Sequence, residues 1–121
     1  DWLVLRAVGG IYRDLAQVGI YRQSVNQGII GRAARLRQPV RVNQVAHDPD
    51  YIPVPVAAAR PVQAELAVPI VIAGRLLGVL NVEAAEPFTE DDATGFEIIV
   101  DQLAIALENA RLFAATEGNL A

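Results

Sequence analysis

The sequence predicts an α+β domain in which helices pack on a central antiparallel β-sheet. Its 121 residues, of which 53% are apolar and 20% charged, are enough to bury one hydrophobic core. Residues 65–72 and 76–84 are rich in Val, Ile and Leu and flank a short turn, which is typical of a β-hairpin. After residue 89 the apolar side chains recur at helical spacing, so we expect a long terminal helix.

The composition excludes several kinds of chemistry. Cysteine is absent, so disulfides, thiolate catalysis, thiolate metal sites and thioether attachment of a cofactor all lack the atom that they require. No apolar run is long enough to span a membrane, so we expect a soluble, cytoplasmic segment without direct membrane contact.

Charge is distributed unevenly along the chain. Residues 1–60 contain eight Arg and four acids (+4), whereas residues 61–121 contain two Arg and ten acids (−8). Such asymmetry can mark a nucleic-acid-binding surface. Here the Arg residues are scattered, without interleaved aromatic residues or a recognised motif, so we expect no nucleic-acid partner.

The first elements are short. Residues 2–8 predict a strand that ends at Gly9-Gly10, because this pair relaxes the backbone. Residues 11–27 lack clean periodicity, which predicts a loop with one helical turn before an extended piece at residues 21–25.

A helix and a long connection follow. Gly28-Ile29-Ile30-Gly31 opens a helix over residues 28–37 that Gln38-Pro39 ends. Residues 40–42 alternate as a short strand, and residues 43–61 form a Pro-rich connection. A connection of this length inside a compact domain is usually functional or disordered.

The predicted hairpin contains a proline. Ala73-Gly74-Arg75 forms its turn, where Gly can supply a positive φ. Pro69 cannot donate a hydrogen bond to a strand ladder, so we expect it to face away from the neighbouring strand, at an edge or a bulge.

The terminal helix has a distinct start and two apolar stripes. Thr89-Glu90-Asp91-Asp92 places a hydroxyl at the N-cap with a carboxylate three residues later, as in a capping box. One stripe predicts the face that covers the sheet, and it consists of Phe96, Val100, Leu103, Leu107 and Ala110. A second stripe recurs every seven residues, and it consists of Ile98, Ile105 and Leu112. Its partner is either a missing N-terminal helix of this chain or the same helix of a second copy.

Seven short segments follow one another in an order typical of one family: Gly28-Ile29-Ile30-Gly31-Arg32-Ala33-Ala34, Gln38-Pro39-Val40-Arg41-Val42, Val45-Ala46-His47-Asp48-Pro49-Asp50-Tyr51, Ala64-Glu65-Leu66-Ala67-Val68-Pro69-Ile70, Leu77-Gly78-Val79-Leu80-Asn81-Val82-Glu83, Pro87-Phe88-Thr89-Glu90-Asp91-Asp92 and Ala106-Leu107-Glu108-Asn109-Ala110-Arg111-Leu112. Over residues 2–113 the chain resembles the GAF family, sensory domains of bacterial histidine kinases, cyclases, phosphodiesterases and phytochromes. The resemblance implies a GAF/PAS-like fold with a ligand pocket roofed by the long connection.

The resemblance also implies a domain organisation. We expect residues 1–121 to be a single, partial GAF-like domain that lacks the family's first helix and first strand. Residues 113–121 are expected to begin a linker to a downstream output domain.

Residues that differ from the family's motifs exclude some of the family's activities for this sequence. Relatives that reduce free methionine sulfoxide, and relatives that hold a bilin covalently, depend on Cys, so this sequence is expected to do neither and not to be an enzyme. Cyclic-nucleotide-binding relatives carry an Asn-Lys pair, but here Val82 follows Asn81.

Four residues are candidate ligand contacts. Tyr51 and Ile52 are expected to line the pocket where the connection folds over the sheet, or else to seal the core. Glu65 could accept hydrogen bonds from a ligand, or bond the backbone of the connection, or pair with Arg60. Arg60 in turn could clamp an anionic ligand or be solvated.

The remaining polar candidates favour structural roles. His47 is the only imidazole and has no companion ligands in the sequence, so we expect no haem. Asp91 and Asp92 fit helix capping better than a metal site or paired acid–base catalysts. We expect no metal and no cofactor.

Two functions remain open. In the first, a sensory domain of a bacterial signalling protein, such as a histidine kinase of a two-component system, binds an unidentified small molecule under the 43–63 connection and signals through the C-terminal helix. In the second, a ligand-free module supplies only a dimer interface and a spacer. Either is expected to form a homodimer through residues 98–113.

Overall fold

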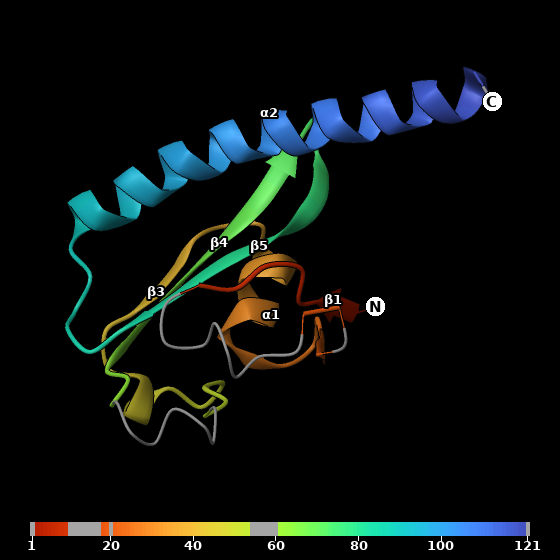
Figure 1. Ribbon diagram of the computed structural model, residues 1–121. Coiled ribbons are helices and arrows are strands. Elements are labelled where there is room, and N and C mark those ends of the chain that lie inside the picture. The colour runs from red at the N-terminus through yellow and green to blue at the C-terminus, as the bar shows by residue number, and fades with distance from the viewer. Residues whose placement is uncertain (1, 10–17, 20, 54–60, 121) are drawn as a thin grey trace.

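The structure is a computed structural model of the chain that describes residues 2–9, 18–19, 21–53 and 61–120. It confirms the α+β class (Figure 1). The elements follow in the order β1 (Trp2–Val4), β2 (Arg22–Ser24), α1 (Gly28–Leu36), β3 (Val40–Val42), a 3₁₀ turn (Val45–His47), β4 (Ala64–Ile72), β5 (Arg75–Ala84) and α2 (Glu90–Leu120).

The described strands form two antiparallel sheets rather than one. β1 pairs with β2, and β4 lies between β3 and β5 in the larger sheet. The predicted hairpin of β4 and β5 is confirmed, with Ala73 at φ 50° and Gly74 at φ 75° in its turn. The described first part of the connection from β3 to β4, residues 43–53, lies at one end of this sheet (Figure 1).

Pro69 lies where the ladder is irregular, as its missing N–H predicts. It is opposite Val79 in β5, and the register shifts between the next two residues, Ile70 and Val71. On the other side of β4 the pairing with β3 stops at Ala67. The proline therefore does not interrupt a regular ladder.

The first core cluster lies between the sheet and α2. Alternate residues of β4 point to this side, among them Leu66, which is completely buried. From α2 the cluster includes Val100 and Ala104, with Phe96 and Leu103 packed against it. Three residues of the predicted stripe, Phe96, Val100 and Leu103, thus cover the sheet as expected.

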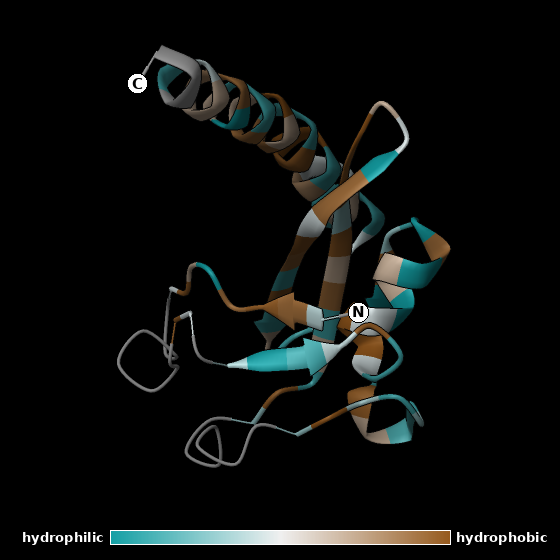
Figure 2. Ribbon diagram, turned by 90° about the vertical axis from the view of Figure 1, so that its right-hand side faces the viewer, coloured by the Kyte–Doolittle hydropathy of each residue, from teal (hydrophilic) through white to brown (hydrophobic). Residues whose placement is uncertain are grey.

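The second core cluster lies on the opposite side of the sheet, beneath α1. Ile29 and Ala33 of α1 pack there against Ala67 of β4 and Val45 of the 3₁₀ turn. Figure 2 shows α1 and α2 on opposite sides of the strands. Because β4 is buried from Ala64 to Ile70, its two faces organise both clusters.

Thr89 and Asp92 form the predicted capping box at the start of α2. The Asp92 N–H donates to Thr89 Oγ1 at 3.1 Å, and the Thr89 N–H donates to Asp92 Oδ2 at 2.8 Å. Just before the cap, the Asn43 side chain bonds both backbone groups of Phe88, at 2.8 and 2.9 Å. The end of β3 therefore holds the start of α2.

Two predicted boundaries differ from the structure. The strand over residues 2–8 ends at Val4; the Leu5 N–H still donates to the Tyr21 carbonyl at 2.9 Å, but its own carbonyl accepts from the Gly19 N–H at 2.7 Å and leaves the ladder. The helix over residues 28–37 ends at Leu36, because Arg37 turns left-handed at φ 54° and caps the Ala33 carbonyl. The helical turn expected within residues 11–27 falls largely outside the described residues.

The inward positions predicted for Leu107 and Ala110 are wrong. Leu107 is 42% exposed and Ala110 is exposed as well. Core contacts of α2 end at Ala104, and the C-terminal half of the helix extends past the sheet (Figure 1). The apolar residues continue at helical spacing beyond Ala104, but the sheet ends there, so Leu107 and Ala110 have no strand to cover.

Gly31 offers a direct test of the α1 packing. A Cβ at this position would lie 2.6 Å from the Val25 backbone carbonyl oxygen, which cannot move as a flexible side chain can. We expect Gly31→Ala to lower the free energy of unfolding by about 1–3 kcal/mol in urea titrations. The control is Gly95→Ala in α2, where nothing lies within 4 Å, and it should instead raise stability by up to about 1 kcal/mol. Equal effects of the two changes would contradict the close approach.

Candidate functional site

A pair of glutamates lies on the sheet face beneath α1. Ala67 and Val79 pack there against α1, and because side chains alternate along a strand, Glu65 and Glu83 point to the same face. The two are directly opposite each other in the β4–β5 register, and Glu65 is only 4% exposed. Glu65 therefore lies in the interior, whereas Glu83 is half-buried.

Their environment favours a shared proton. Burial raises the pKa of Glu65 to about 8, and the charge of Glu83 and the hydrogen bond between the two side chains raise it as well. The charge of Asp48 acts in the same direction, whereas the Arg32 guanidinium opposes it. At neutral pH Glu65 therefore keeps its proton.

Tyr51 lies close to this pair. Its ring packs against the core cluster beneath α1. Burial raises the pKa of the Tyr51 phenol, and the negative charges of Glu83 and Glu65 raise it further. The phenol therefore remains neutral and can donate a hydrogen bond at this position.

Asn81 adds an acceptor to the same face. It precedes Glu83 by two residues in β5 and is opposite Ala67, so it is diagonal to Glu65. Its Oδ1 is buried and has no hydrogen-bond partner within the described part of the chain. A buried acceptor without a partner is costly, which makes this oxygen a candidate ligand contact.

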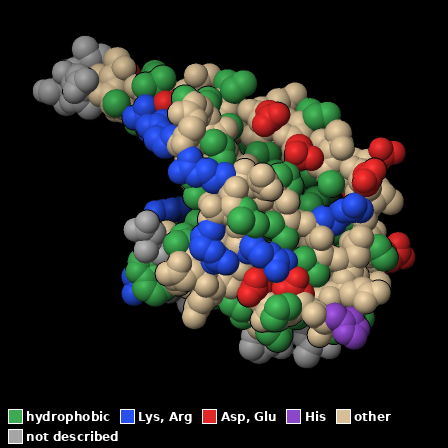
Figure 3. All heavy atoms as spheres, turned by 180° about the vertical axis from the view of Figure 1, so that it is seen from behind, with side chains coloured by type: hydrophobic (Ala, Val, Ile, Leu, Met, Phe, Trp, Pro, Cys, Tyr) green, Lys and Arg blue, Asp and Glu red, His purple; other side chains and the backbone are tan. Residues whose placement is uncertain are grey.

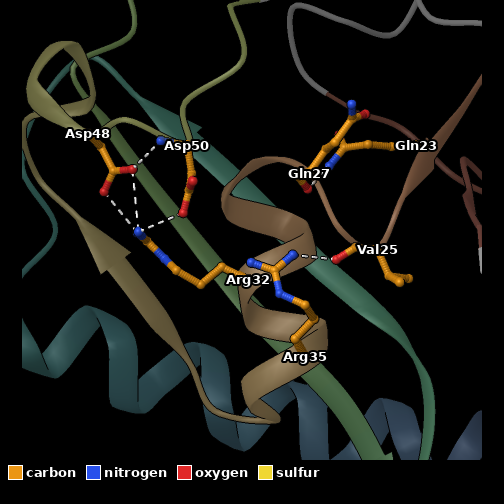
Figure 4. A network of polar contacts seen from close by, with 7 residues as sticks. All are labelled: Gln23, Val25, Gln27, Arg32, Arg35, Asp48 and Asp50. Atoms are coloured by element: carbon orange, nitrogen blue, oxygen red, sulfur yellow. Dashed lines mark hydrogen bonds and ion pairs between the residues drawn. The ribbon is translucent and has the colours of Figure 1, made fainter.

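An ion-pair network, here called the Arg32 latch, ties the connection to α1 (Figure 4). Arg32 Nη2 lies 2.8 Å from Asp48 Oδ2, and Arg32 Nη1 lies 3.1 Å from Asp50 Oδ2. The Asp50 N–H donates to Asp48 Oδ1 at 2.9 Å, which closes a local turn. On this side of the molecule acidic and basic side chains lie next to one another (Figure 3).

The Arg32 latch lowers the pKa of Asp48. Burial alone would raise the pKa of Asp48, but the hydrogen bond from Arg32, the Asp50 N–H and the guanidinium charge outweigh it and lower the pKa. The Asp48 side chain is only 13% exposed, so this pair is better shielded from water than a surface salt bridge. The first half of the connection is thereby held over the glutamate pair.

Both ends of α1 are bonded to the segment around β2 (Figure 4). The Gln23 side-chain amide donates to the Gln27 carbonyl at 2.6 Å, and Arg35 Nη1 donates to the Val25 carbonyl at 2.5 Å. Ile52 Cδ1 comes within 3.2 Å of the position that a Cβ on Gly28 would occupy. The connection therefore touches α1 at its first turn as well as at Arg32.

The structure brings together two of the four predicted ligand contacts. Glu65 and Tyr51 lie close together beneath α1, whereas Ile52 is 41% exposed above the first turn of that helix. Arg60 lies outside the described residues. The proposed pairing of Glu65 with Arg60 therefore has no structural account, and the partner that the structure gives Glu65 is Glu83.

A hollow of about 140 Å³ lies elsewhere, between α2, β4 and the turn that joins α1 to β3. Its lining includes Arg37, Pro69, Glu97 and Asp101. It lies on the α2 side of the sheet, away from the glutamate pair. We therefore place the candidate site at Glu65 and not at this hollow.

His47 and the acids at the start of α2 have structural positions. His47 is exposed on the 3₁₀ turn, where its N–H donates to the Gln44 carbonyl at 3.0 Å. Asp92 caps α2, as predicted. Among the described residues, no group of three or more His, Cys, Asp and Glu side chains is placed to hold a metal ion.

Sequence reasoning did not identify Glu83, Asn81 and the Arg32 latch. The signal for Glu83 and Asn81 was present, because alternation from Val79 places both on the face of Glu65 once the hairpin register is known. No pattern in the sequence indicated the latch, because Arg32 is separated from Asp48 and Asp50 by 16 and 18 residues along the chain.

The fold and the site define a small α+β domain whose antiparallel sheet lies between two helices. A model of the GAF domain family matches residues 5–108, and the chain belongs to this family. GAF domains are a sensory and regulatory fold. No curated protein sequence matches the chain closely. No helix in the described ranges is both long and apolar enough to cross a membrane.

Solved structures of two kinds resemble the chain. The GAF domain of a phosphoenolpyruvate-protein phosphotransferase from Coxiella burnetii is 26% identical, with a TM-score of 0.73 over 81% of this chain and 60% of that one. Free methionine-R-sulfoxide reductase from Neisseria meningitidis, solved with its substrate, is 26% identical, with a TM-score of 0.67 over 80% and 57%. The GAF-B domain of DevS from Mycobacterium smegmatis, at 22% identity and a TM-score of 0.69 over 99% and 77%, supports the fold alone. The chain thus spans about 60% of the length of the first two.

Glu65 predicts an unusual pH dependence of stability. Its pKa is higher in the folded chain than in the unfolded one, so its contribution is fully present below pH 4.5 and is lost as the pH rises through about 8. The free energy of unfolding of the wild type should therefore fall across this interval, and Glu65→Gln should remove most of that fall. Asp48 does not interfere, because its lowered pKa acts below 3.8.

Urea titrations at a series of pH values within that interval measure both slopes. The matched control is Glu86→Gln, which removes an exposed carboxyl near the end of β5 and should keep the wild-type slope. If Glu65→Gln and the wild type lose stability in parallel, the proton on the glutamate pair is assigned wrongly.

Proposed function

We propose that this chain is a non-catalytic sensory domain that binds a small molecule beneath the 43–63 connection and signals through α2. The observation that carries the proposal is the polar group beneath α1, where the buried Glu65 meets the half-buried Glu83, Asn81 and Tyr51. Such a group is costly in a core and is typical of a binding site. The Arg32 latch holds part of the connection above it, so occupation of the site can be felt by the connection and by α1.

A chain of contacts leads from α1 to α2. Arg37, at the C-terminal end of α1, donates through Nη1 to the Gly74 carbonyl in the hairpin turn. The next residue, Arg75, lies 2.5 Å from Glu108 of α2, and Glu108 also pairs with Arg111 at 2.7 Å. The hairpin turn is therefore bonded to both helices, and a shift of α1 can reach α2 through it.

The absence of cysteine supports a regulatory role over a catalytic one. The methionine sulfoxide reductases among the structural relatives share the fold. The 121 residues contain no Cys, so a thiol mechanism has no nucleophile here. We propose that the segment regulates a covalently linked output domain, such as a histidine kinase of a bacterial two-component system, in the cytoplasm.

The exposed side of α2 supports a homodimer. Ile98, Ile105 and Leu112 are 55%, 57% and 49% exposed and recur every seven residues on the side away from the sheet. Ile99 and Phe113, at 54% and 67% exposed, widen this apolar face. We propose that the same face of a second copy covers it.

A ligand-free dimerisation module is the second candidate. It is favoured by the position of the hollow, which lies beside α2 and not at Glu65, and by the exposed apolar face of α2. Native mass spectrometry of the freshly purified protein separates the two functions. A retained small molecule supports the sensory domain, whereas a bare dimer under all conditions supports the module.

Ligand binding and signalling are tested together by NMR. We expect at least one member of a panel of amines, carboxylates, nucleosides and sugars to shift the amide signals of Tyr51 and Glu65 and also those of α2 near Glu108. In Arg75→Ala the α2 shifts should shrink while the site shifts remain, because the link through Glu108 is lost. Binding without any α2 shift in the wild type contradicts the signalling route, and a panel that produces no shift contradicts the site.

The dimer is tested by charge insertion. Replacing Ile98 and Ile105 together with Glu should convert the protein to a monomer that remains folded, because both side chains are more than half exposed. Burial of three aliphatic side chains per subunit contributes about 1.5–3 kcal/mol each before the cost of association. Analytical ultracentrifugation and circular dichroism measure the two results.

The control adds the same charge outside the stripe. Ala114→Glu with Ala115→Glu, at two exposed positions on other sides of α2, should leave the dimer intact. A wild type that is monomeric at high concentration, or a stripe variant that unfolds, contradicts the proposed interface.

A further inference from the structure

We propose that Asn43 couples the connection to the start of α2, so that release of the Arg32 latch also loosens the first turn of that helix. The inference rests on the proposed signalling function and adds a second route from the connection to α2. The first route runs through the hairpin turn to Glu108, far along the helix, whereas this one acts at its N-terminal end. The coupling itself can be measured without any ligand.

Asn43 and Arg41 bond the backbone of Phe88, and the three residues are here called the Phe88 clamp. Asn43 Nδ2 and Arg41 Nη1 donate to the Phe88 carbonyl at 2.9 and 2.8 Å, and the Phe88 N–H donates to Asn43 Oδ1 at 2.8 Å. The two valines of β3 pack beneath α1, so alternation along the strand turns Arg41 and Asn43 to the α2 side. Both backbone polar groups of Phe88 are therefore bonded from the end of β3.

Phe88 determines where α2 begins. It is 7% exposed, and its ring meets the Phe96 ring of α2 edge to face at a centroid distance of 6.3 Å. The next residue, Thr89, caps the helix through Asp92 and accepts from the Ala93 N–H at 3.1 Å. No strand pairs with Phe88 in the part of the chain that the structure describes, so its backbone depends on the clamp. Loss of the clamp would leave buried backbone groups without partners, which destabilises this turn.

Asn43 is also the first residue of the connection. Two positions later, Val45 is buried in the core cluster beneath α1. The 3₁₀ turn then closes on itself, because the Asp48 N–H donates to the Val45 carbonyl at 3.0 Å. Asp48 is the residue that the Arg32 latch holds at 2.8 Å. Residues 43–48 therefore form a short, internally bonded link between the latch and the clamp.

The latch and the clamp constrain the same short link from its two ends. Restraints on one segment are not independent, because a segment released at one end gains freedom that lowers the cost of releasing the other. A shift of α1 also reaches the link directly, since Val45 packs against that helix. Opening of the latch and fraying of the first turn of α2 should therefore occur together more often than two unlinked events.

Native-state hydrogen exchange followed by NMR tests the coupling. We expect Arg32→Gln, which breaks the latch, to speed exchange of the Phe88 and Asp92 amides by about tenfold relative to the Leu66 amide in the central strand β4. The matched control is Arg35→Gln on the same helix, whose guanidinium bonds the loop before α1 and not the connection. It should leave both exchange ratios unchanged.

A double-mutant cycle tests whether the effect passes through Asn43. Asn43→Ala alone should speed exchange of the Asp92 amide, and Arg32→Gln added to it should change that rate by less than about twofold more. Asn43→Asp keeps the acceptor for the Phe88 N–H, so it should keep most of the response to Arg32→Gln. Thr89→Ala removes the helix cap but not the clamp, so the Phe88 amide should still respond in that background.

Two results would overturn the coupling. The first is Phe88 and Asp92 exchange that Arg32→Gln leaves unchanged relative to Leu66. The second is a cycle in which Arg32→Gln and Asn43→Ala multiply their effects on the Asp92 amide independently. Circular dichroism confirms that each variant is folded, and if Asn43→Ala does not fold, the response of the wild type to Arg32→Gln decides alone.

A ligand experiment separates this inference from the proposed function. If exchange shows the coupling but no compound binds beneath the connection, the coupling stands and the sensory function fails. If a compound binds and shifts the Thr89 and Asp92 amides equally in the wild type and in Asn43→Ala, the sensory function stands and the coupling through Asn43 is overturned. If those shifts shrink in Asn43→Ala while the shifts at Tyr51 remain, both are supported.

Discussion

The burial of β4 on both faces is the constraint on which the rest of the structure depends. From Ala64 to Ile70 every residue of this strand is in the interior, so one face must be covered by α2 and the other by α1. Apolar residues meet this demand on the α2 side. On the α1 side the strand places Glu65 in the same buried layer, and the fold must then stabilise a carboxyl where no water can solvate it.

The groups that stabilise the buried Glu65 carboxyl are polar and lie close to it. Glu83 forms a hydrogen bond with Glu65, Tyr51 lies near both, and the Arg32 latch ties the first half of the connection to α1. Each of these groups would be less costly at the surface, and together they stabilise the core less than apolar residues would. Their concentration at one point beneath a long connection is the physical reason to regard this face as a binding site.

The candidate site and the contacts that link the two helices lie at opposite ends of the β4–β5 hairpin. The glutamate pair lies near the open end of β4 and β5, and the turn at the other end is bonded to α1 through Arg37 and to α2 through Glu108. A hairpin whose strands are paired along their length moves largely as a unit, so a displacement at one end can shift the other end. The part of α2 beyond the sheet, with its exposed apolar face, is then free to contact a second copy or a following domain.

Local patterns in the sequence determined much of the fold. The hairpin, the strand at residues 40–42, the capping box of Thr89 and Asp92 and the start of α1 at Gly28 follow from short-range preferences that act within a few residues. The sequence also singled out Glu65 and Tyr51 as candidate contacts. The sequence could not show that α2 extends beyond the end of the sheet. Its periodicity therefore predicts a core position for Leu107, which is exposed in the structure.

The tertiary structure alone decided what surrounds Glu65. Its partner Glu83 depends on the register of the β4–β5 ladder, in which a shift of one residue would turn the side chain to the other face. The latch joins Arg32 to residues 16 and 18 positions away, a distance that only the path of the connection brings within hydrogen-bonding range. Secondary structure was determined by interactions between near neighbours, whereas the charge and protonation of the site were decided by contacts that exist only after the chain has folded.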